Sequence, residues 1–197
     1  MNQSDLFSYL SAFVTIVLAI AITDMIQSTH RLIRARRRIK WDMAPLIFAG
    51  AIAIAVLSEF FALWDIFAVT KITFPRLLWM LLVPTLVALL AYSVLPDDVP
   101  QGGLDLREFY TAERRTWVVM FGLMAVFDIA RSVALISHRR DWVFEYAIFT
   151  SRLLPFTVAG LILMWIGRSR RWDLAGVLLV AAVVTYGNMS WVISARP

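Results

Sequence analysis

Long apolar stretches alternate with short charged connectors along this chain. Six stretches, at about residues 7–27, 43–69, 74–95, 116–137, 144–167 and 172–194, each hold the roughly 20 mostly apolar residues that a helix needs to cross about 30 Å of hydrocarbon. Polar faces do not interrupt them at regular intervals, as they would in the helices of a soluble domain. The pattern predicts an all-α bundle of six transmembrane helices, forming one transmembrane domain over residues 1–197.

Composition and tryptophan positions agree with this segment count. Hydrophobic residues make up 60% of the chain and charged residues only 17%, and the mean hydropathy is +0.74, above the apolar share of ordinary soluble domains. Tryptophan favours the interface between lipid and water. All eight tryptophans fall near a predicted helix end: Trp41, Trp64, Trp79, Trp117, Trp142, Trp165, Trp172 and Trp191.

The distribution of Lys and Arg predicts the orientation. The start, "MNQSDLF", lacks the positive segment of a cleaved signal peptide, so we expect the first helix to be retained. The first, third and fifth connectors carry twelve Lys and Arg residues, whereas the second and fourth connectors and the C-terminus carry five. Positive residues favour the cytoplasmic side. We therefore predict a multi-pass protein of the cell (inner) membrane with its N- and C-termini outside.

The net charge of +5 and the pI of about 10.1 require no nucleic-acid partner, because the arginines cluster where topology signals belong. The expected partners are the lipid bilayer and either copies of the same chain or other membrane subunits.

The only long connector, "PDDVPQGGLDLREFYTAERR" at residues 96–115, is predicted to be cytoplasmic. Its Pro and Gly residues predict an irregular start. The mixed apolar and charged residues after Gly103 predict a short interfacial helix. This connector would separate two three-helix halves, and an odd number of spans per half would invert the second half relative to the first, as in inverted-repeat transporters.

Charged residues inside the apolar stretches are the main functional signal. In "FDIARSV", Asp128 falls near the predicted midplane and Arg131 one turn nearer the outer face. Each charge at the centre costs roughly 2.5 to 3.5 kcal/mol on insertion scales. Depth counting places Glu59 near Arg131 and Arg152 near Asp128. We predict a buried network pairing Asp128 with Arg152 and Glu59 with Arg131, completed by hydrogen bonds from Asn188.

The sequence supports three functional hypotheses, the first two from this network and the third from the long connector. A carboxylate at depth could bind a cation or relay a proton, which predicts a small channel or an ion- or proton-coupled transporter. Alternatively, the charges fix helix register or dock a partner helix, which predicts a non-catalytic subunit of a larger membrane complex. The third hypothesis is an intramembrane lipid-directed enzyme, with the acids of the long connector around Mg²⁺ (Asp97, Asp98, Asp105 and Glu108).

Other catalytic chemistry has no candidate residues in the sequence. There is no Cys, and the two histidines, His30 and His138, fall in connectors on opposite faces, so we predict no metal site and no catalytic residue. The two lysines of the chain, Lys40 and Lys71, both lie near the surface, which leaves none for a buried Schiff base. We accordingly predict no cofactor.

Overall fold

The computed structural model describes the backbone of residues 3–66, 74–136, 140–167 and 169–194. Side chains are described for these residues except 3–7, 63–66, 74–77, 79–80, 131–136, 140–151 and 189–194. Within these ranges the fold is all-α with six helices, as the sequence predicts. The helices are α1 (Gln3–Arg34), α2 (Met43–Ile66), α3 (Phe74–Ser93), α4 (Leu106–Ile136), α5 (Arg140–Ile166) and α6 (Arg170–Ser194).

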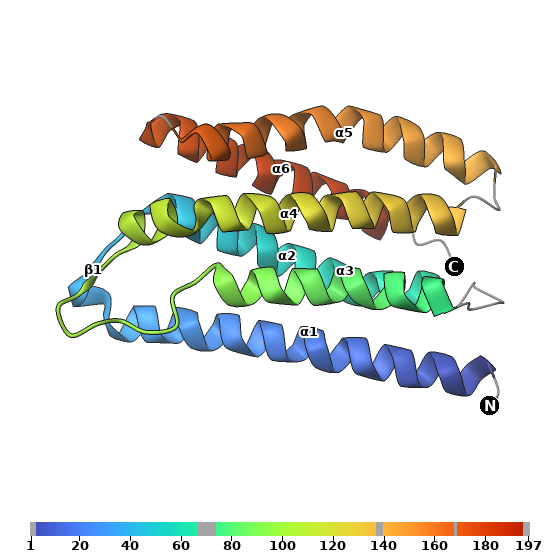
Figure 1. Ribbon diagram of the computed structural model, residues 1–197, viewed down its shortest axis with the longest axis horizontal. Helices are drawn as coiled ribbons and strands as arrows, with labels where there is room; N and C mark the ends of the chain where they lie inside the picture. Colours follow the sequence, from blue (N-terminus) through green and yellow to red (C-terminus); the bar gives the residue numbers. More distant parts are fainter. Residues whose placement is uncertain (1–2, 67–73, 137–139, 168, 195–197) are drawn as a thin grey trace.

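The six helices lie roughly side by side along the length of the molecule and alternate in direction (Figure 1). The most extensive packing joins α5 to α6, α2 to α6, α3 to α4 and α1 to α3. The α1–α2, α3–α4 and α5–α6 connections lie at one end of the bundle, which we name the connector end. Helix α1 starts and helix α6 ends at the opposite end (Figure 1).

Two connectors pair at the connector end. A short 3₁₀ helix (Arg36–Arg38) leads from α1 into β1 (Ile39–Lys40), which pairs in parallel with β2 (Leu104–Asp105) from the α3–α4 connector. Gly103 has a φ of +95°, and a Cβ there would lie 2.6 Å from the carbonyl oxygen of Arg38. Glycine is therefore needed for these two connectors to approach each other.

Two helices are longer than predicted at the connector end. Helix α1 continues beyond residue 27 to Arg34 because Ser28 and Leu32 keep facing the buried side. Helix α4 begins at Leu106 and runs without a break to Ile136, so the helix expected after Gly103 forms the first turns of α4 and is not a separate element. Its interfacial position stays a prediction. The Asp105 carboxylate accepts the backbone N–H of Arg107 at 2.9 Å, which caps the start of α4.

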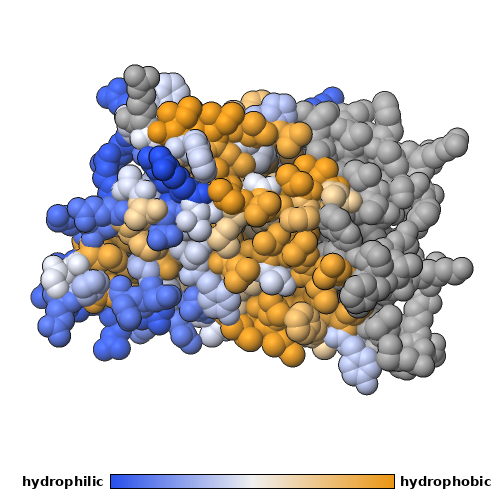
Figure 2. Space-filling view, in the orientation of Figure 1, coloured by the Kyte–Doolittle hydropathy of each residue, from blue (hydrophilic) through white to orange (hydrophobic). Residues whose placement is uncertain are grey.

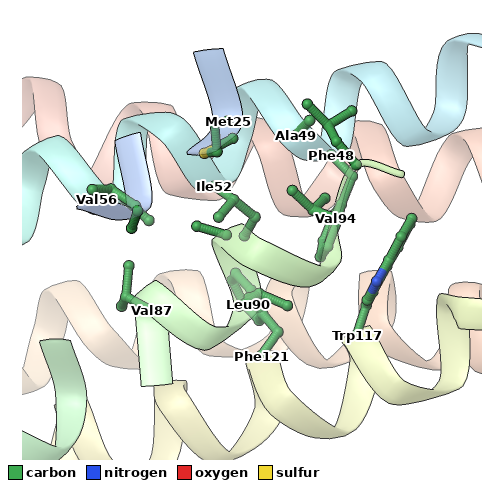
Figure 3. Packing of buried hydrophobic residues seen from close by; sticks show 14 of the residues in the cluster. Met25, Phe48, Ala49, Ile52, Val56, Val87, Leu90, Val94, Trp117 and Phe121 are labelled. Carbon is green, nitrogen blue, oxygen red and sulfur yellow. The ribbon is translucent and has the colours of Figure 1, made fainter. Parts of the chain in front are cut away.

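The core packs the apolar faces of the six helices together, with most of its buried residues on α1, α2, α3 and α4. Met25 of α1, Ile52 and Val56 of α2, and Val87 and Leu90 of α3 are buried against one another (Figure 3). Nearer the connector end, the Phe48 ring of α2 stacks on the Trp117 ring of α4, with centroids 5.3 Å apart and planes 12° apart.

Trp117 is buried in the core and does not have the exposed, interfacial position predicted for the tryptophans. Its side chain is 0% exposed, and its indole N–H donates to the Ser93 carbonyl at 3.1 Å. Trp41, Trp165 and Trp172 are exposed. Trp64, Trp79, Trp142 and Trp191 lie outside the described side chains. A tryptophan close to a predicted helix end can thus belong to the core, because the first turns of α4 add packing surface around it.

Large apolar side chains cover the outside of the bundle. The hydrophilic residues gather at the connector end and border a broad hydrophobic band (Figure 2). Exposed members of this band come from all six helices and include Phe13, Ile16, Ile20, Leu57, Phe61, Leu89, Leu123, Val126, Phe156, Ile162 and Leu178. Monomeric soluble proteins rarely expose contiguous apolar surface on this scale.

Two helical segments of the described residues are long and apolar enough to cross a membrane: Ser8–Arg34 and Met43–Ala62. Length and composition alone do not separate such helices from a signal sequence or from the core helix of a soluble protein. In α1 only 22% of the apolar window is buried inside the bundle, against 50% in α2. Shorter apolar helical stretches occupy Leu81–Ser93 and Arg152–Ile166.

Candidate functional site

The connector end is held by an ion pair between α4 and α6. The Arg114 guanidinium donates to Asp173 Oδ1 at 2.9 Å, and the two side chains are only 12% and 9% exposed. Asp173 lies in the first turn of α6, where the helix dipole favours a carboxylate. We call Arg114 and Asp173 the connector-end ion pair.

Glycine at position 167 makes room for this pair. Gly167 follows the last residue of α5 with a φ of +48°, and its N–H donates to the Leu163 carbonyl at 3.1 Å, an αL helix end. A Cβ at this position would overlap the Arg114 guanidinium. The conformation and the space both require glycine, so the end of α5, the start of α6 and Arg114 form one unit.

A second ion pair joins α2 to α6 at the same end. Asp42 Oδ1 accepts the backbone N–H of Ala44 at 2.9 Å and caps α2, and Oδ2 pairs with Arg170 at 3.3 Å. Asp42 is buried whereas Arg170 is exposed. Asp42 therefore both caps a helix N-terminus and forms an ion pair with another helix.

A buried tyrosine lies beside these charges. Tyr110 is 2% exposed, and its hydroxyl has no hydrogen-bond partner among the described residues. Burial raises the pKa of Tyr110 above its usual range, and the nearby Asp173 carboxylate raises it further. The phenol therefore stays protonated at any physiological pH.

The helix registers set the depth of the residues predicted for the charge network. Helices α2 and α4 both start at the connector end, and the Phe48–Trp117 stack fixes a common level on them. Glu59 follows Phe48 by eleven residues and Asp128 follows Trp117 by eleven, which places both carboxylates roughly 16 Å deeper. By this count the two acids fall at about one level of the bundle.

Counting along the helices places Arg152 and Asn188 at about the same level as the acids. Counted from the connector-end ion pair, Asp128 is 14 residues beyond Arg114 and Asn188 is 15 beyond Asp173, while Arg152 precedes Gly167 by 15. Each count corresponds to about 21 or 22 Å along a helix. We name the four residues of this level, Glu59, Asp128, Arg152 and Asn188, the central layer.

The members of the central layer differ in burial. Glu59 is buried, with 9% exposure, and Asp128 is half-buried. Asn188 is half-buried and its side-chain amide donates to the Val184 carbonyl of its own helix at 2.6 Å. Arg152 is exposed, and the described residues offer it no ion pair. The side chain of Arg131 lies outside the described residues, one turn beyond Asp128 on α4, and the pairings within the network stay predictions.

Asp105, one of the four acids that the enzyme hypothesis places around Mg²⁺, has a structural role. Asp105 caps α4 and also pairs with Lys40 at 3.5 Å. The backbone N–H of Arg107 holds the pKa of Asp105 below its usual value. Across the described part of the chain, no three acidic or histidine side chains lie close enough together to hold a metal ion.

The connector-end ion pair was missed by sequence reasoning. Arg114 and Asp173 are 59 residues apart, and each sits in a stretch of mixed charge typical of a solvated connector. The glycine after the last apolar residue of α5 was the available signal, because glycine at that position predicts an αL helix end.

Comparison of the chain with protein-family models, with curated proteins and with solved structures finds no match.

Proposed function

We propose that this chain is a membrane protein with six transmembrane helices that acts as a channel or as an ion- or proton-coupled transporter, with the acids of the central layer, Glu59 and Asp128, in its polar pathway.

The exposed apolar band supports the membrane. It includes exposed side chains from all six helices. On the face shown in Figure 2 the charged residues border it at the connector end. A bilayer is the environment in which large side chains such as Phe13, Leu57 and Phe156 can stay exposed without cost. The arginines at the connector end favour the cytoplasm for that end.

Glu59 is the observation that carries the ion-binding role. Its carboxylate is 9% exposed in the middle of an apolar helix, at the depth of Asp128. An ionised carboxylate there loses most of its hydration, so a cation, a proton or a cationic side chain has to compensate. Acidic side chains within a membrane bind cations or relay protons, and two acids from α2 and α4 at about one level would suit either role.

Flux through reconstituted protein tests this proposal. We expect proteoliposomes to pass K⁺, Na⁺ or H⁺ down a gradient reported by ion-sensitive dyes, and Asp128→Asn and Glu59→Gln to reduce that flux at least about tenfold. Each change keeps the shape of the side chain and removes the charge. Asp98→Asn removes one carboxylate from an exposed position in the connector and should leave flux unchanged.

Normal flux in both central-layer variants would exclude the transport role. If flux is absent from all proteins and a foreign membrane chain copurifies at fixed stoichiometry, the second candidate applies, a non-catalytic subunit of a larger complex. The exposure of Arg152 on the outer side of α5 favours that alternative, because a guanidinium within an apolar surface fits a partner helix that carries an acid. Release of the partner by Arg152→Leu would then identify the interface.

A further inference from the structure

The connector between α1 and α2 presents a compact positive surface. We define the basic turn as Arg34, Arg36, Arg37, Arg38 and Lys40, whose side chains are all exposed. Ala35 and Ile39 alternate with them and are buried, so the backbone turns the charged side chains outward. The basic turn therefore follows from the fold and is not a free tail.

Backbone contacts hold the basic turn in place. The N–H of Arg38 donates to the Ala35 carbonyl at 2.8 Å, and β1 pairs with β2 through Ile39 and Leu104. The backbone of Gly103 lies directly against the Arg38 carbonyl. A surface fixed in this way loses little conformational entropy when it binds a ligand.

The positive charge of the basic turn is not balanced locally. Only Lys40 has a carboxylate partner among the described residues, Asp105 at 3.5 Å, and that pair is largely open to water. Two other acids of this end, Asp42 and Asp173, pair with Arg170 and Arg114. The four arginines therefore remain available for an anionic ligand.

The residues that flank the basic turn are apolar and exposed. Ile33 precedes it with 53% exposure, and Trp41 and Met43 follow it with 46% and 58%. Exposed apolar side chains thus directly precede and follow the exposed charged ones along the chain. A ligand that matches both features has an anionic layer directly next to an apolar one.

We propose that the basic turn binds the headgroups of acidic phospholipids, with Ile33, Trp41 and Met43 in contact with the acyl region of the same leaflet. The proposal rests on the membrane placement given above. Clusters of four or more Lys and Arg next to a membrane-spanning helix attract anionic lipid, and an indole ring favours the headgroup level. An acidic protein or a nucleic acid would match the arginines but not the apolar flank.

Lipid titration of the full chain in a neutral detergent tests the proposal. Native mass spectrometry counts the phosphatidylglycerol and phosphatidylcholine molecules retained. We expect the protein to prefer phosphatidylglycerol, and the triple variant Arg36→Gln, Arg37→Gln, Arg38→Gln to bind it about tenfold to a hundredfold more weakly, since each cation near an anionic surface contributes a few-fold.

A charge-matched variant provides the control. Arg107→Gln, Arg115→Gln, Arg171→Gln removes three exposed arginines from the same end of the bundle and should weaken binding less than about threefold. Equal losses in the two triple variants would reduce the effect to net charge and overturn the proposal. No preference for phosphatidylglycerol, or equally tight binding of its water-soluble headgroup alone, would also overturn it.

Membrane extraction separates this proposal from the proposed function. If the protein resists alkaline extraction from membranes but shows no lipid preference, the basic turn does not bind acidic headgroups and the membrane placement stands. If the protein is released from membranes by alkali, the membrane placement fails, and the lipid proposal fails with it.

Discussion

The connector end and the central layer both contain acids and arginines, but the acids differ in where they lie along their helices. At the connector end, Asp173 pairs with Arg114 at 2.9 Å and Asp42 pairs with Arg170 at 3.3 Å. In the central layer, Glu59 and Asp128 are placed at one depth within apolar helices, 11 residues beyond an aromatic stack. The carboxylates of the connector end join helix ends, whereas those of the central layer lie within helices, away from any helix end.

The difference has a physical cause. Asp42, Asp105 and Asp173 all lie at helix N-termini, where free N–H groups and the helix dipole stabilise a carboxylate. A carboxylate in mid-helix has no such support and costs insertion energy. We therefore expect changes at the connector end to act on stability, and changes in the central layer to act on transport.

Breaking the connector-end ion pair should have the largest effect on stability. We expect Arg114→Leu to lower the free energy of unfolding in detergent by about 3 kcal/mol, because it leaves the Asp173 carboxylate buried without its partner. The double variant Arg114→Leu, Asp173→Leu should recover most of that loss, since two apolar side chains leave no uncompensated charge. Denaturant unfolding followed by circular dichroism measures both.

Lys40→Leu is the matched control for this prediction, because it breaks an exposed pair with Asp105 and should cost less than about 1 kcal/mol. Flux per folded molecule should survive Arg114→Leu. A double variant as unstable as the single one, or a loss of flux as large as in Asp128→Asn, would contradict the division between the two regions.

Gly167→Ala tests the same end through the backbone. We expect a loss of about 2 kcal/mol, because a non-glycine residue at φ +48° is strained and its Cβ would displace the Arg114 guanidinium. Gly102→Ala is the matched control: an added Cβ there meets no atom within 4 Å. Thermal unfolding of the two variants in the same detergent gives the comparison, and equal stability would show that Arg114 does not depend on Gly167.

Tyr110→Phe should have the smallest effect at neutral pH. The buried hydroxyl makes no hydrogen bond with a described residue, so its removal should change the free energy of unfolding by less than about 1 kcal/mol. A loss of 2 kcal/mol or more would show that the hydroxyl holds a bound partner such as water.

The same variant has an expected pH dependence. The pKa of Tyr110 is raised in the folded protein, so the unfolded chain releases the phenol proton first, near pH 10. Stability should then fall as the pH rises above about 10, and Tyr110→Phe should lose less of it. Unfolding curves between pH 8 and 11 measure the difference, and parallel losses in the two proteins would contradict the raised pKa.

Sequence reasoning predicted the elements better than their ends. The apolar stretches gave six helices because continuous apolar runs dominate the pattern. The start of α4 and the end of α1 were missed. The ten residues before Thr116 have the mixed charge of a connector, but Leu106 and Tyr110 continue a buried helix face through them. Trp117 was assigned to the interface for the same reason, because nothing local shows that a further stretch of helix covers it.

By itself, the sequence determined the number and type of the helices, the cluster of arginines at one end and the presence of acids within apolar segments, because these depend on residue type and local spacing. Tertiary structure decided which residues share a level and which are paired. The Phe48–Trp117 stack set the register of Glu59 against Asp128, and the turn at Gly167 brought Arg114 to Asp173. Contacts between residues 59 or 69 positions apart depend on how whole helices pack, and no local pattern encodes that packing.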